Sequence, residues 1–492
     1  MLESLLILSI FLPLLFIIIF KPFQTKTGIK SPPKSYPFIG HYFSIRANGN
    51  HLVEWVTKLV LNSPTLTTYI HRPFGQKRVI TANPSVVKHI LKTNFLTYQK
   101  GDVFRASFHD FIGDGIFNVS GDEWKFIRQL SSHEFNTNSL RHFVEDVVDI
   151  ELNERLIPIL ANAAANNTII DLQDILQRFS FDSICKISFG YDPKYLIPSL
   201  PQSKFAIAFD DALRTTTERF HNITPWKLKR FLNIGSEKRL KEAVSEIRQF
   251  SKKVLNQKKQ ESSIQTVDLL SRFLCSGHTD ENFLTDMVIN TILAGRETTS
   301  ASLTWYFWLL SKNPLVISEI VREINEVKSD ARVYDEVKDM VYTHASLCES
   351  LRLYPPVPVD SKTALADDIL PDGTAVKKGM VVTYSPYAMG RVEEAWGPDW
   401  MDFRPERWLK NDETTKKVRF VPKDPYTYSV FQAGPRICLG KDMAFLQMKR
   451  LVAGVIGRFD IIPATGDDFE PVMTTLTSKM KGGFPVKIME RR

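Results

Sequence analysis

A single cysteine near the end of the chain lies in a setting that can hold a metal-bearing cofactor. Cys438 falls within Phe431–Gly440, which reads FQAGPRICLG, and an amphipathic run that predicts a helix follows directly. Pro435 disfavours a helix entering from the N-terminal side, and Gly434 lets the backbone approach a bulky ligand. The start of the next helix stabilises a thiolate over a thiol. A loop thiolate of this kind suits the axial ligand of a haem iron.

The same ten residues match a known pattern. Phe431, Gly434, Arg436, Cys438 and Gly440 stand at the spacing of a haem-thiolate signature, and the stretch resembles that of the cytochrome P450 family. The resemblance implies haem b (iron protoporphyrin IX) as the cofactor, with Cys438 as the iron ligand. It also makes Arg436 a candidate partner for a haem propionate, which must be neutralised if buried. A buried structural cysteine is the alternative for an isolated Cys, but five fixed positions favour haem ligation.

A second motif, TILAGRETTS, lies within a long stretch that predicts a central helix. Oxygen activation at a haem needs protons, which a hydroxyl and an acid near the iron can deliver. The motif resembles the oxygen-binding groove of the same family. On that match Ala294 and Gly295 border the oxygen site, Glu297 is the acid, and Thr298 is the alcohol that relays protons. The residues alone also permit a core helix that carries a solvated charge pair.

Three charged residues predict a structural brace beneath the haem. Glu349 and Arg352 stand three residues apart on one predicted helix, where an ordinary ion pair is the simplest interpretation. The family pairs such a Glu and Arg with an arginine from a later irregular segment, here Arg407 by resemblance. Trp124 and Arg128, one helical turn apart, resemble the propionate-binding helix of the family, and a core aromatic is the alternative for the tryptophan.

The substrate is predicted to be hydrophobic and elongated, because the segments that face the distal pocket by family analogy are apolar and aromatic. Segments such as LKTNF, GIFNVSGDEW and PPVPVDSK resemble one plant branch of the family. That branch oxidises the terminal carbon of fatty acids, jasmonoyl–amino acid conjugates and, in some members, sterol side chains. The predicted pocket residues are Phe104, Phe117, Val357, Val359, Leu476 and Thr477. The basic residues available to hold a carboxylate head are Arg214, Arg219, Lys227, Lys229 and Arg230.

The resemblance implies a monooxygenase that uses O2 and electrons from NADPH, delivered by NADPH-cytochrome P450 reductase, to hydroxylate a terminal (omega) carbon. The sequence leaves fatty acid, jasmonoyl conjugate and sterol side chain open. Two other classes are a reductase-independent haem isomerase or dehydratase and a non-catalytic haem or lipid carrier; the Glu297–Thr298 pair disfavours both. The predicted contacts with an acidic reductase are Lys441, Lys449 and Arg450.

Composition favours one large globular domain. The 492 residues are 43% hydrophobic and 24% charged, with no repeat of fixed period. The four cysteines have no spacing typical of a disulfide framework, which fits a reducing compartment. The net charge of +8 suits an anionic membrane surface and an acidic protein partner. Nucleic acid is not predicted as a partner, because no basic run is interleaved with aromatic residues.

The N-terminus predicts an uncleaved signal-anchor. Leu5–Phe20 is apolar apart from one serine and one proline, Glu3 precedes it, and four lysines follow it. This charge order places the rest of the chain in the cytosol. We therefore expect a transmembrane anchor at residues 1–20, a basic proline-rich linker at 21–40, and a catalytic domain at 41–492. With the family resemblance, the expected location is the endoplasmic reticulum membrane, crossed once.

The elements that must position these residues are mostly helical. The fold class that the sequence predicts is mainly α with a small β portion, which is the cytochrome P450 fold. The longest predicted helix is Thr285–Lys312, with Thr285 as its N-cap. Phe95–Asp122 is dense in Phe and Gly and predicts a loop-rich stretch. An irregular segment is expected to run from Val392 to Val430, directly before the cysteine loop.

Overall fold

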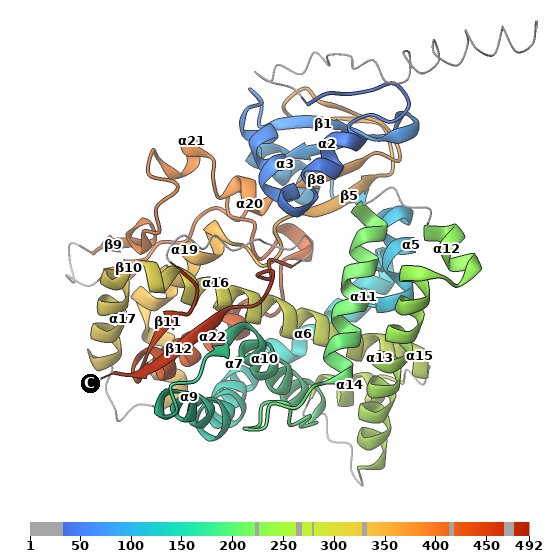
Figure 1. Ribbon diagram of the computed structural model, residues 1–492. Coiled ribbons are helices and arrows are strands. Elements are labelled where there is room, and N and C mark those ends of the chain that lie inside the picture. Colours follow the sequence, from blue (N-terminus) through green and yellow to red (C-terminus); the bar gives the residue numbers. More distant parts are fainter. Residues whose placement is uncertain are drawn as a thin grey trace, which may run out of the picture.

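The computed structural model describes residues 33–221, 226–261, 268–277, 280–326, 332–412, 418–466 and 477–491. These residues form a helix-rich body with a smaller β-rich lobe (Figure 1). The prediction of a mainly α protein with a small β portion is confirmed. The predicted anchor at residues 1–20 lies outside the described residues. Within the described ranges, no helix is both long and apolar enough to span a bilayer.

Helices dominate the described part of the chain. They are α2 (Tyr42–Ala47), α3 (Leu52–Leu61), α4 (Pro84–Lys88), α5 (Gly101–Ile112), α6 (Gly121–Ser132), α7 (Thr137–His142), α8 (Asp149–Glu151), α9 (Ile157–Ala165), α10 (Leu172–Phe189), α11 (Lys204–His221), α12 (Trp226–Leu232), α13 (Gly235–Gln260), α14 (Leu269–Cys275), α15 (Glu281–Ile292), α16 (Thr298–Lys312), α17 (Pro314–Glu326), α18 (Val333–Asp339), α19 (Val341–Leu353), α20 (Pro386–Met389), α21 (Glu393–Trp396) and α22 (Lys441–Ile456).

The strands form one larger sheet and three small ones. They are β1 (Thr67–His71), β2 (Lys77–Thr81), β3 (Tyr98–Gln99), β4 (Ile170–Asp171), β5 (Asp360–Ala364), β6 (Asp368–Ile369), β7 (Ala375–Val376), β8 (Val381–Tyr384), β9 (Leu409–Asn411), β10 (Val418–Phe420), β11 (Phe459–Pro463) and β12 (Pro485–Glu490). The larger sheet has the order β1-β2-β8-β5-β3, and the small ones pair β11-β12-β4, β10-β9 and β6-β7. In the larger sheet β2 and β8 are parallel and the other pairs are antiparallel.

The central helix differs from the prediction at its start and in its middle. It begins at Glu281, because the Asp280 side chain accepts a hydrogen bond from the backbone N–H of Asn282. Thr285 is not the cap; its hydroxyl donates to the Glu281 carbonyl oxygen at 2.7 Å. A π-helical turn at Leu293–Glu297 separates α15 from α16. Such a turn often marks a functional site, and here it falls within the predicted oxygen-binding motif.

The stretch that predicts loops, Phe95–Asp122, contains the twelve-residue helix α5. Phe104, Phe108 and Phe111 are spaced by four and then three residues, so they share one helix face. Phe108 and Phe111 are buried, and the Phe104 ring stacks on Phe108 with centroids 4.6 Å apart. The helical spacing of the phenylalanines therefore outweighs the glycines at both ends, and the segment forms a helix.

Candidate active site

A cavity of about 350 Å³ lies inside the helical body, next to the cysteine loop. Its wall includes Cys438 from that loop and Ala294, Gly295 and Thr298 from the central helix. Most of the remaining wall is apolar. The apolar and aromatic members are Ile116, Phe117, Trp124, Phe135, Phe143, Ile184, Ile187, Leu269, Pro356, Val357, Val430, Phe431, Leu439, Met443, Ala444 and Met448.

The backbone of the cysteine loop holds the sulfur in this wall. The Cys438 N–H donates to the Phe431 carbonyl oxygen at 2.8 Å. Gly434 has a φ of 66°, and a Cβ there would lie 2.1 Å from the Leu91 carbonyl oxygen, so only glycine fits. Burial raises the pKa of the Cys438 thiol, whereas a hydrogen bond from the Gly440 backbone lowers it. The loop therefore presents a sulfur with a donor beside it.

Two arginines add positive charge to the same wall. The Arg436 guanidinium lies 4.5 Å from the centre of the Trp124 ring, and the Arg128 guanidinium lies 5.8 Å from it. Arg436 also donates to the Val119 carbonyl oxygen at 2.9 Å. Within the described residues neither arginine has a carboxylate in ion-pair contact. Burial, and then the charge of Arg128, lower the pKa of Arg436 to about 10 despite the attraction of Asp360. These two side chains suit a buried carboxylate ligand.

Two lysines at this site, one directly before α5 and one in β5, were not predicted. Lys100 and Lys362 both line the cavity, and their ammonium groups lie 3.2 and 2.6 Å from the Asp360 carboxylate. Burial raises the pKa of Asp360, but the two lysines outweigh it and hold that pKa well below its usual value. Burial lowers the pKa of Lys362 to about 7. Two cations facing one carboxylate leave a further positive charge at the cavity.

These features fit a haem. The wall combines one cysteine sulfur, an apolar surface and arginine and lysine groups in excess of the carboxylates beside them. Cys438 would ligate the iron, and Arg128, Arg436 and Lys362 would neutralise the propionates. Trp124 is 6% exposed and packs between the two arginines and the apolar wall. The sequence predicted Trp124, Arg128 and Arg436 at this site. It did not predict Lys362, whose only distinguishing feature in the sequence is its place two residues after Asp360.

The predicted oxygen motif is divided between the cavity and a buried ion cluster. The Thr298 hydroxyl donates to the Ala294 carbonyl oxygen at 2.7 Å, and both residues line the cavity. Glu297 is fully buried and does not line it in the described part of the chain. Its carboxylate pairs with Arg296 and, at 2.7 Å, with the ammonium group of Lys479. The alcohol and the acid are thus adjacent in sequence but face different surroundings.

Gly295 allows the central helix to pack closely against α10. A Cβ at this position would lie 2.5 Å from the Ile184 side chain. Gly295 also sits within the π-helical turn and lines the cavity. The glycine thus serves both the close packing of the two helices and the altered helical turn beside the cavity.

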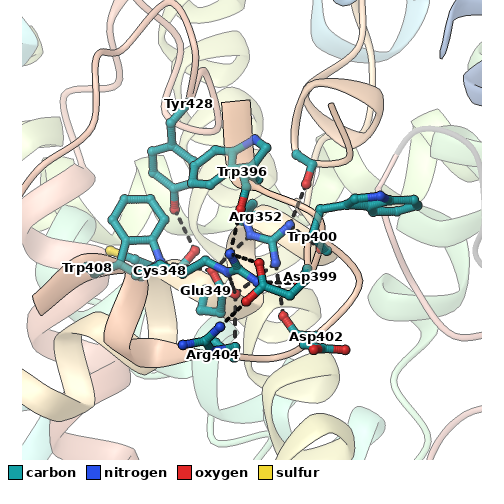
Figure 2. Close-up of polar contacts among 12 residues, drawn as sticks. Cys348, Glu349, Arg352, Trp396, Asp399, Trp400, Asp402, Arg404, Trp408 and Tyr428 are labelled. Carbon is teal, nitrogen blue, oxygen red and sulfur yellow. Dashed lines mark hydrogen bonds and ion pairs between the residues drawn. The ribbon is translucent and has the colours of Figure 1, made fainter. Parts of the chain in front are cut away.

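The predicted brace is assembled around Glu349, as Figure 2 shows. Arg352 donates to both carboxylate oxygens of Glu349, at 2.9 and 2.7 Å, and Arg407 donates at 3.1 Å. Glu349 and Arg352 are fully buried. Arg352 reaches on to the carbonyl oxygens of Trp400 and Asp402, at 2.7 and 3.1 Å. These contacts tie α19 to the irregular segment that leads into the cysteine loop.

The predicted substrate residues fall into three groups. Phe117 and Val357 line the cavity. Phe104 and Thr477 are described but do not line it, because Phe104 packs between Phe108 and Phe220 and Thr477 is buried elsewhere. Val359 lines a second, smaller cavity. Leu476 lies outside the described residues.

Comparison with known proteins agrees with this geometry. The family model described as Cytochrome P450 matches residues 31–486. The chain therefore belongs to the cytochrome P450 family, and it is a haem-thiolate monooxygenase, an oxidoreductase. Within the family it is similar to plant members of the group numbered 94. It is 58% identical over 488 residues to cytochrome P450 94A2 of Vicia sativa (95% of each chain), and 57% identical over 466 residues to cytochrome P450 94A1 of the same plant (93% of this chain, 90% of the relative). Cytochrome P450 94B1 of Arabidopsis thaliana is 44% identical over 502 residues, covering 99% of this chain and 97% of the relative.

Proposed function

We propose that this monooxygenase hydroxylates the terminal (omega) carbon of a fatty acid or a fatty-acid-derived conjugate. The observation that carries the proposal is the apolar wall around Thr298, to which Phe117 and Val357 contribute. With Arg128 and Arg436 assigned to the haem propionates, a free carboxylate placed against the apolar part of this wall would lose its hydration without gaining partners. The apolar end of the substrate therefore enters the space near Cys438, and the polar head stays outside it.

The haem supplies the oxygen and electron chemistry when bound, and the protein supplies the proton path and a dry cavity. The Thr298 hydroxyl faces the cavity and is able to pass a proton to a group there. The Glu297 carboxylate, next to Thr298 in the chain, is linked to solvent through Lys479, whose ammonium group lies 2.7 Å from Glu297 and 2.9 Å from Asp210. Asp210 is 48% exposed. Protons thus have a chain of titratable groups from the surface to the central helix.

The electrons come from NADPH through a reductase that docks near the cysteine loop. Lys441, at the start of α22, is exposed and available to an acidic partner. The other two predicted docking residues are not available to such a partner. Lys449 is 4% exposed and donates to the Lys338 carbonyl oxygen, and Arg450 pairs with Asp149. The proposed contact surface is therefore reduced to Lys441 and its exposed neighbours.

The proposed location is the endoplasmic reticulum membrane, crossed once, with the catalytic domain in the cytosol. The apolar run at residues 5–20 and the lysines after it support this orientation. Exposed aromatic side chains near the start of the described chain and on α12 would suit a bilayer surface. These are Phe38, Phe74 and Phe231, at 66, 85 and 84% exposure.

Microsomes that contain the protein and a reductase test the function. We expect NADPH-dependent conversion of a long-chain fatty acid, or of a jasmonoyl–amino acid conjugate, to the product hydroxylated at the terminal carbon. Conversion of a sterol side chain instead would contradict the substrate class. Turnover of a lipid hydroperoxide without NADPH and reductase would identify a haem isomerase or dehydratase.

A further inference from the structure

A second cavity, of about 70 Å³, lies within the β-rich lobe beside the end of α11. Most of its wall is apolar and comes from α2, α3 and the larger sheet. Two residues of this wall, Arg72 and Arg78, carry positive charge, and His221 is a third titratable group beside them. The apolar members are Ile45, Leu52, Val53, Trp55, Val56, Ile70, Ile80 and Val359.

The strand register places both arginines on one face of the sheet. Ile70 of β1 pairs directly with Arg78 of β2. Arg72 lies one residue beyond the end of β1, where the backbone is still extended (φ −110°, ψ 165°), and it lines the same cavity as Ile70 and Arg78. Thr383 of β8 pairs with Ile80 and continues this face. The sheet therefore presents two guanidinium groups side by side to the cavity.

Neither guanidinium has an acidic partner in the described part of the chain. Arg72 is 8% exposed, and its side chain makes no hydrogen bond or ion pair among the described residues. Arg78 donates to the Phe220 carbonyl oxygen at 3.0 Å and lies 4.8 Å from the centre of the Phe220 ring. A buried cation without a counter-ion is costly.

The pKa shifts of these groups agree with a binding site for an anion. Burial lowers the pKa of Arg72 to about 10 and that of Arg78 to about 9, and the charge of Arg72 adds to the second shift. Burial, and then these two charges, lower the pKa of His221 to about 3. Burial also lowers the pKa of Arg219, but Glu237 and Asp110 outweigh it and raise that pKa above its usual value. An anion at Arg72 and Arg78 would have the same effect there.

The basic residues that the sequence offered for a carboxylate head are mostly engaged elsewhere. Arg219 is 5% exposed and pairs with Glu237 and Asp110. Arg230 also pairs with Asp110, at 3.0 Å. Arg214 pairs with Asp211 on the exposed side of α11. Lys227 is exposed on α12 and lies 5.8 Å from the centre of the Trp226 ring. Three of the five predicted partners therefore already have a carboxylate, which favours another site for the head of the substrate.

The second cavity is close to the first along the chain. Val357 and Asp360 line the cavity that contains Cys438, and Val359 between them lines the smaller one. Val357 and Val359 are separated by at most about 7 Å of chain. The two cavities therefore border the same short segment of chain, residues 357–360.

We infer that Arg72 and Arg78 bind the carboxylate of the substrate while its far end extends into the cavity at Cys438. The two guanidinium groups face one cavity, so together they are able to donate several charge-assisted hydrogen bonds to a carboxylate. With the head held there, only the terminal carbons reach the haem cavity. This inference rests on the proposed function, because it assigns the head-group site of the same substrate.

The test compares dodecanoic acid with methyl dodecanoate on the full-length, haem-loaded protein. The affinity of each is measured by equilibrium dialysis and by titration of the haem absorption spectrum. Arg72→Gln and Arg78→Gln should each weaken the acid about tenfold or more and leave the ester within about twofold. Arg78→Lys should keep much of the affinity for the acid, because it keeps the charge.

The matched control is Lys77→Gln. Lys77 precedes Arg78 on β2, is exposed, and points to the opposite face of the sheet. Lys77→Gln should leave the affinity for both dodecanoic acid and its methyl ester unchanged. In microsomes with reductase, the two arginine variants should also spread hydroxylation from the terminal carbon to positions inside the chain.

Three results would overturn the inference. The first is an equal loss of affinity for acid and ester, which would assign the arginines a purely structural role. The second is unchanged affinity for the acid in both Gln variants. The third is weaker binding to phosphatidylserine vesicles with unchanged affinity for the acid, which would assign the pair to lipid head groups. Arginine-dependent binding without terminal hydroxylation would uphold this site and contradict the proposed function.

Discussion

Replacing Glu349 by Gln perturbs the brace between α19 and the segment before the cysteine loop. Among the described residues, the Glu349 carboxylate accepts five hydrogen bonds, in the cluster drawn in Figure 2. Two come from Arg352, at 2.9 and 2.7 Å, and one comes from Arg407, at 3.1 Å. The others come from the backbone N–H of Arg404 at 3.1 Å and from the Trp408 ring N–H at 2.9 Å. Glutamine keeps the size of the side chain, removes its charge, and turns one acceptor oxygen into a donor.

The expected cost follows from the charges that remain. Arg352 is fully buried and Arg407 nearly so, with 10% of its side chain exposed, so neither guanidinium can regain its hydration. Arg407 keeps the Asp399 carboxylate at 2.7 Å, whereas Arg352 keeps only backbone carbonyl oxygens. Removing one partner of a buried ion pair costs about 3–5 kcal/mol. That loss is a large fraction of the roughly 5–15 kcal/mol that stabilises a typical folded protein.

The measurement is the guanidinium chloride midpoint, followed by haem absorbance and by tryptophan fluorescence. A melting temperature is less sensitive, because unfolding a chain of this size carries an entropy of about 1 kcal/mol/K and the expected shift is only about 3–5 °C. Glu406→Gln is the control, since Glu406 is exposed and, among the described residues, accepts only from the Tyr342 hydroxyl at 3.3 Å. It should stay within about 0.5 kcal/mol of the wild type. A Glu349→Gln protein with an unchanged midpoint and full haem content would refute the reasoning.

Four further predictions use other residues. Cys438→Ala should bind little haem or lack the red-shifted absorption band that reduced, CO-bound haem thiolates show; a variant that keeps this band would disprove the ligand assignment. Thr298→Ala should keep CO binding but form less product per NADPH consumed, and unchanged coupling would remove Thr298 from the proton path. Burial, and then the charges of nearby lysines, lower the pKa of His344 to about 3 in the folded chain. In the unfolded chain this histidine binds a proton below about pH 6.5, so acid favours unfolding. Acidification from pH 7 to 5.5 should therefore cost about 1 kcal/mol through this group, and His344→Phe should remove that part of the loss in denaturant titrations at the two pH values. Asn166 is exposed in an N-x-T sequon and should carry no glycan if the domain is cytosolic. A glycosidase-sensitive mass shift would show that the domain is lumenal instead.

Local patterns predicted the fold class and much of the site. The Cys438 loop was recognisable because its glycines and proline are needed by the loop backbone itself, whatever surrounds it. Gly434 illustrates this, since its positive φ and the nearby Leu91 carbonyl leave no room for a side chain. The helix α5 was missed for the opposite reason. Its glycines drew more weight than the spacing of Phe104, Phe108 and Phe111, although burial of that face decides the structure.

Contacts between distant segments were beyond the sequence. Lys100 and Lys362 face one carboxylate because β3 pairs with β5, and the pairing of Gln99 with Thr363 brings them together. A strand register of this kind depends on which faces are buried, which the two short segments do not specify. The same holds for Val359, which was assigned to the substrate pocket but lines the neighbouring cavity.

The sequence by itself determined the haem-thiolate family and the mainly helical class, because both are encoded in residues that lie near one another in the chain. The oxygen motif stays a prediction. Only the tertiary structure decided which of many arginines remain without a carboxylate. Arg219 looked available from its sequence, yet two carboxylates from other elements neutralise it. Arg72 and Arg78 drew no attention in the sequence, yet the sheet directs both into one cavity where none of the described carboxylates meets them. The physical reason is that a charge is balanced by what lies within a few ångströms of it, and that neighbourhood is assembled by packing.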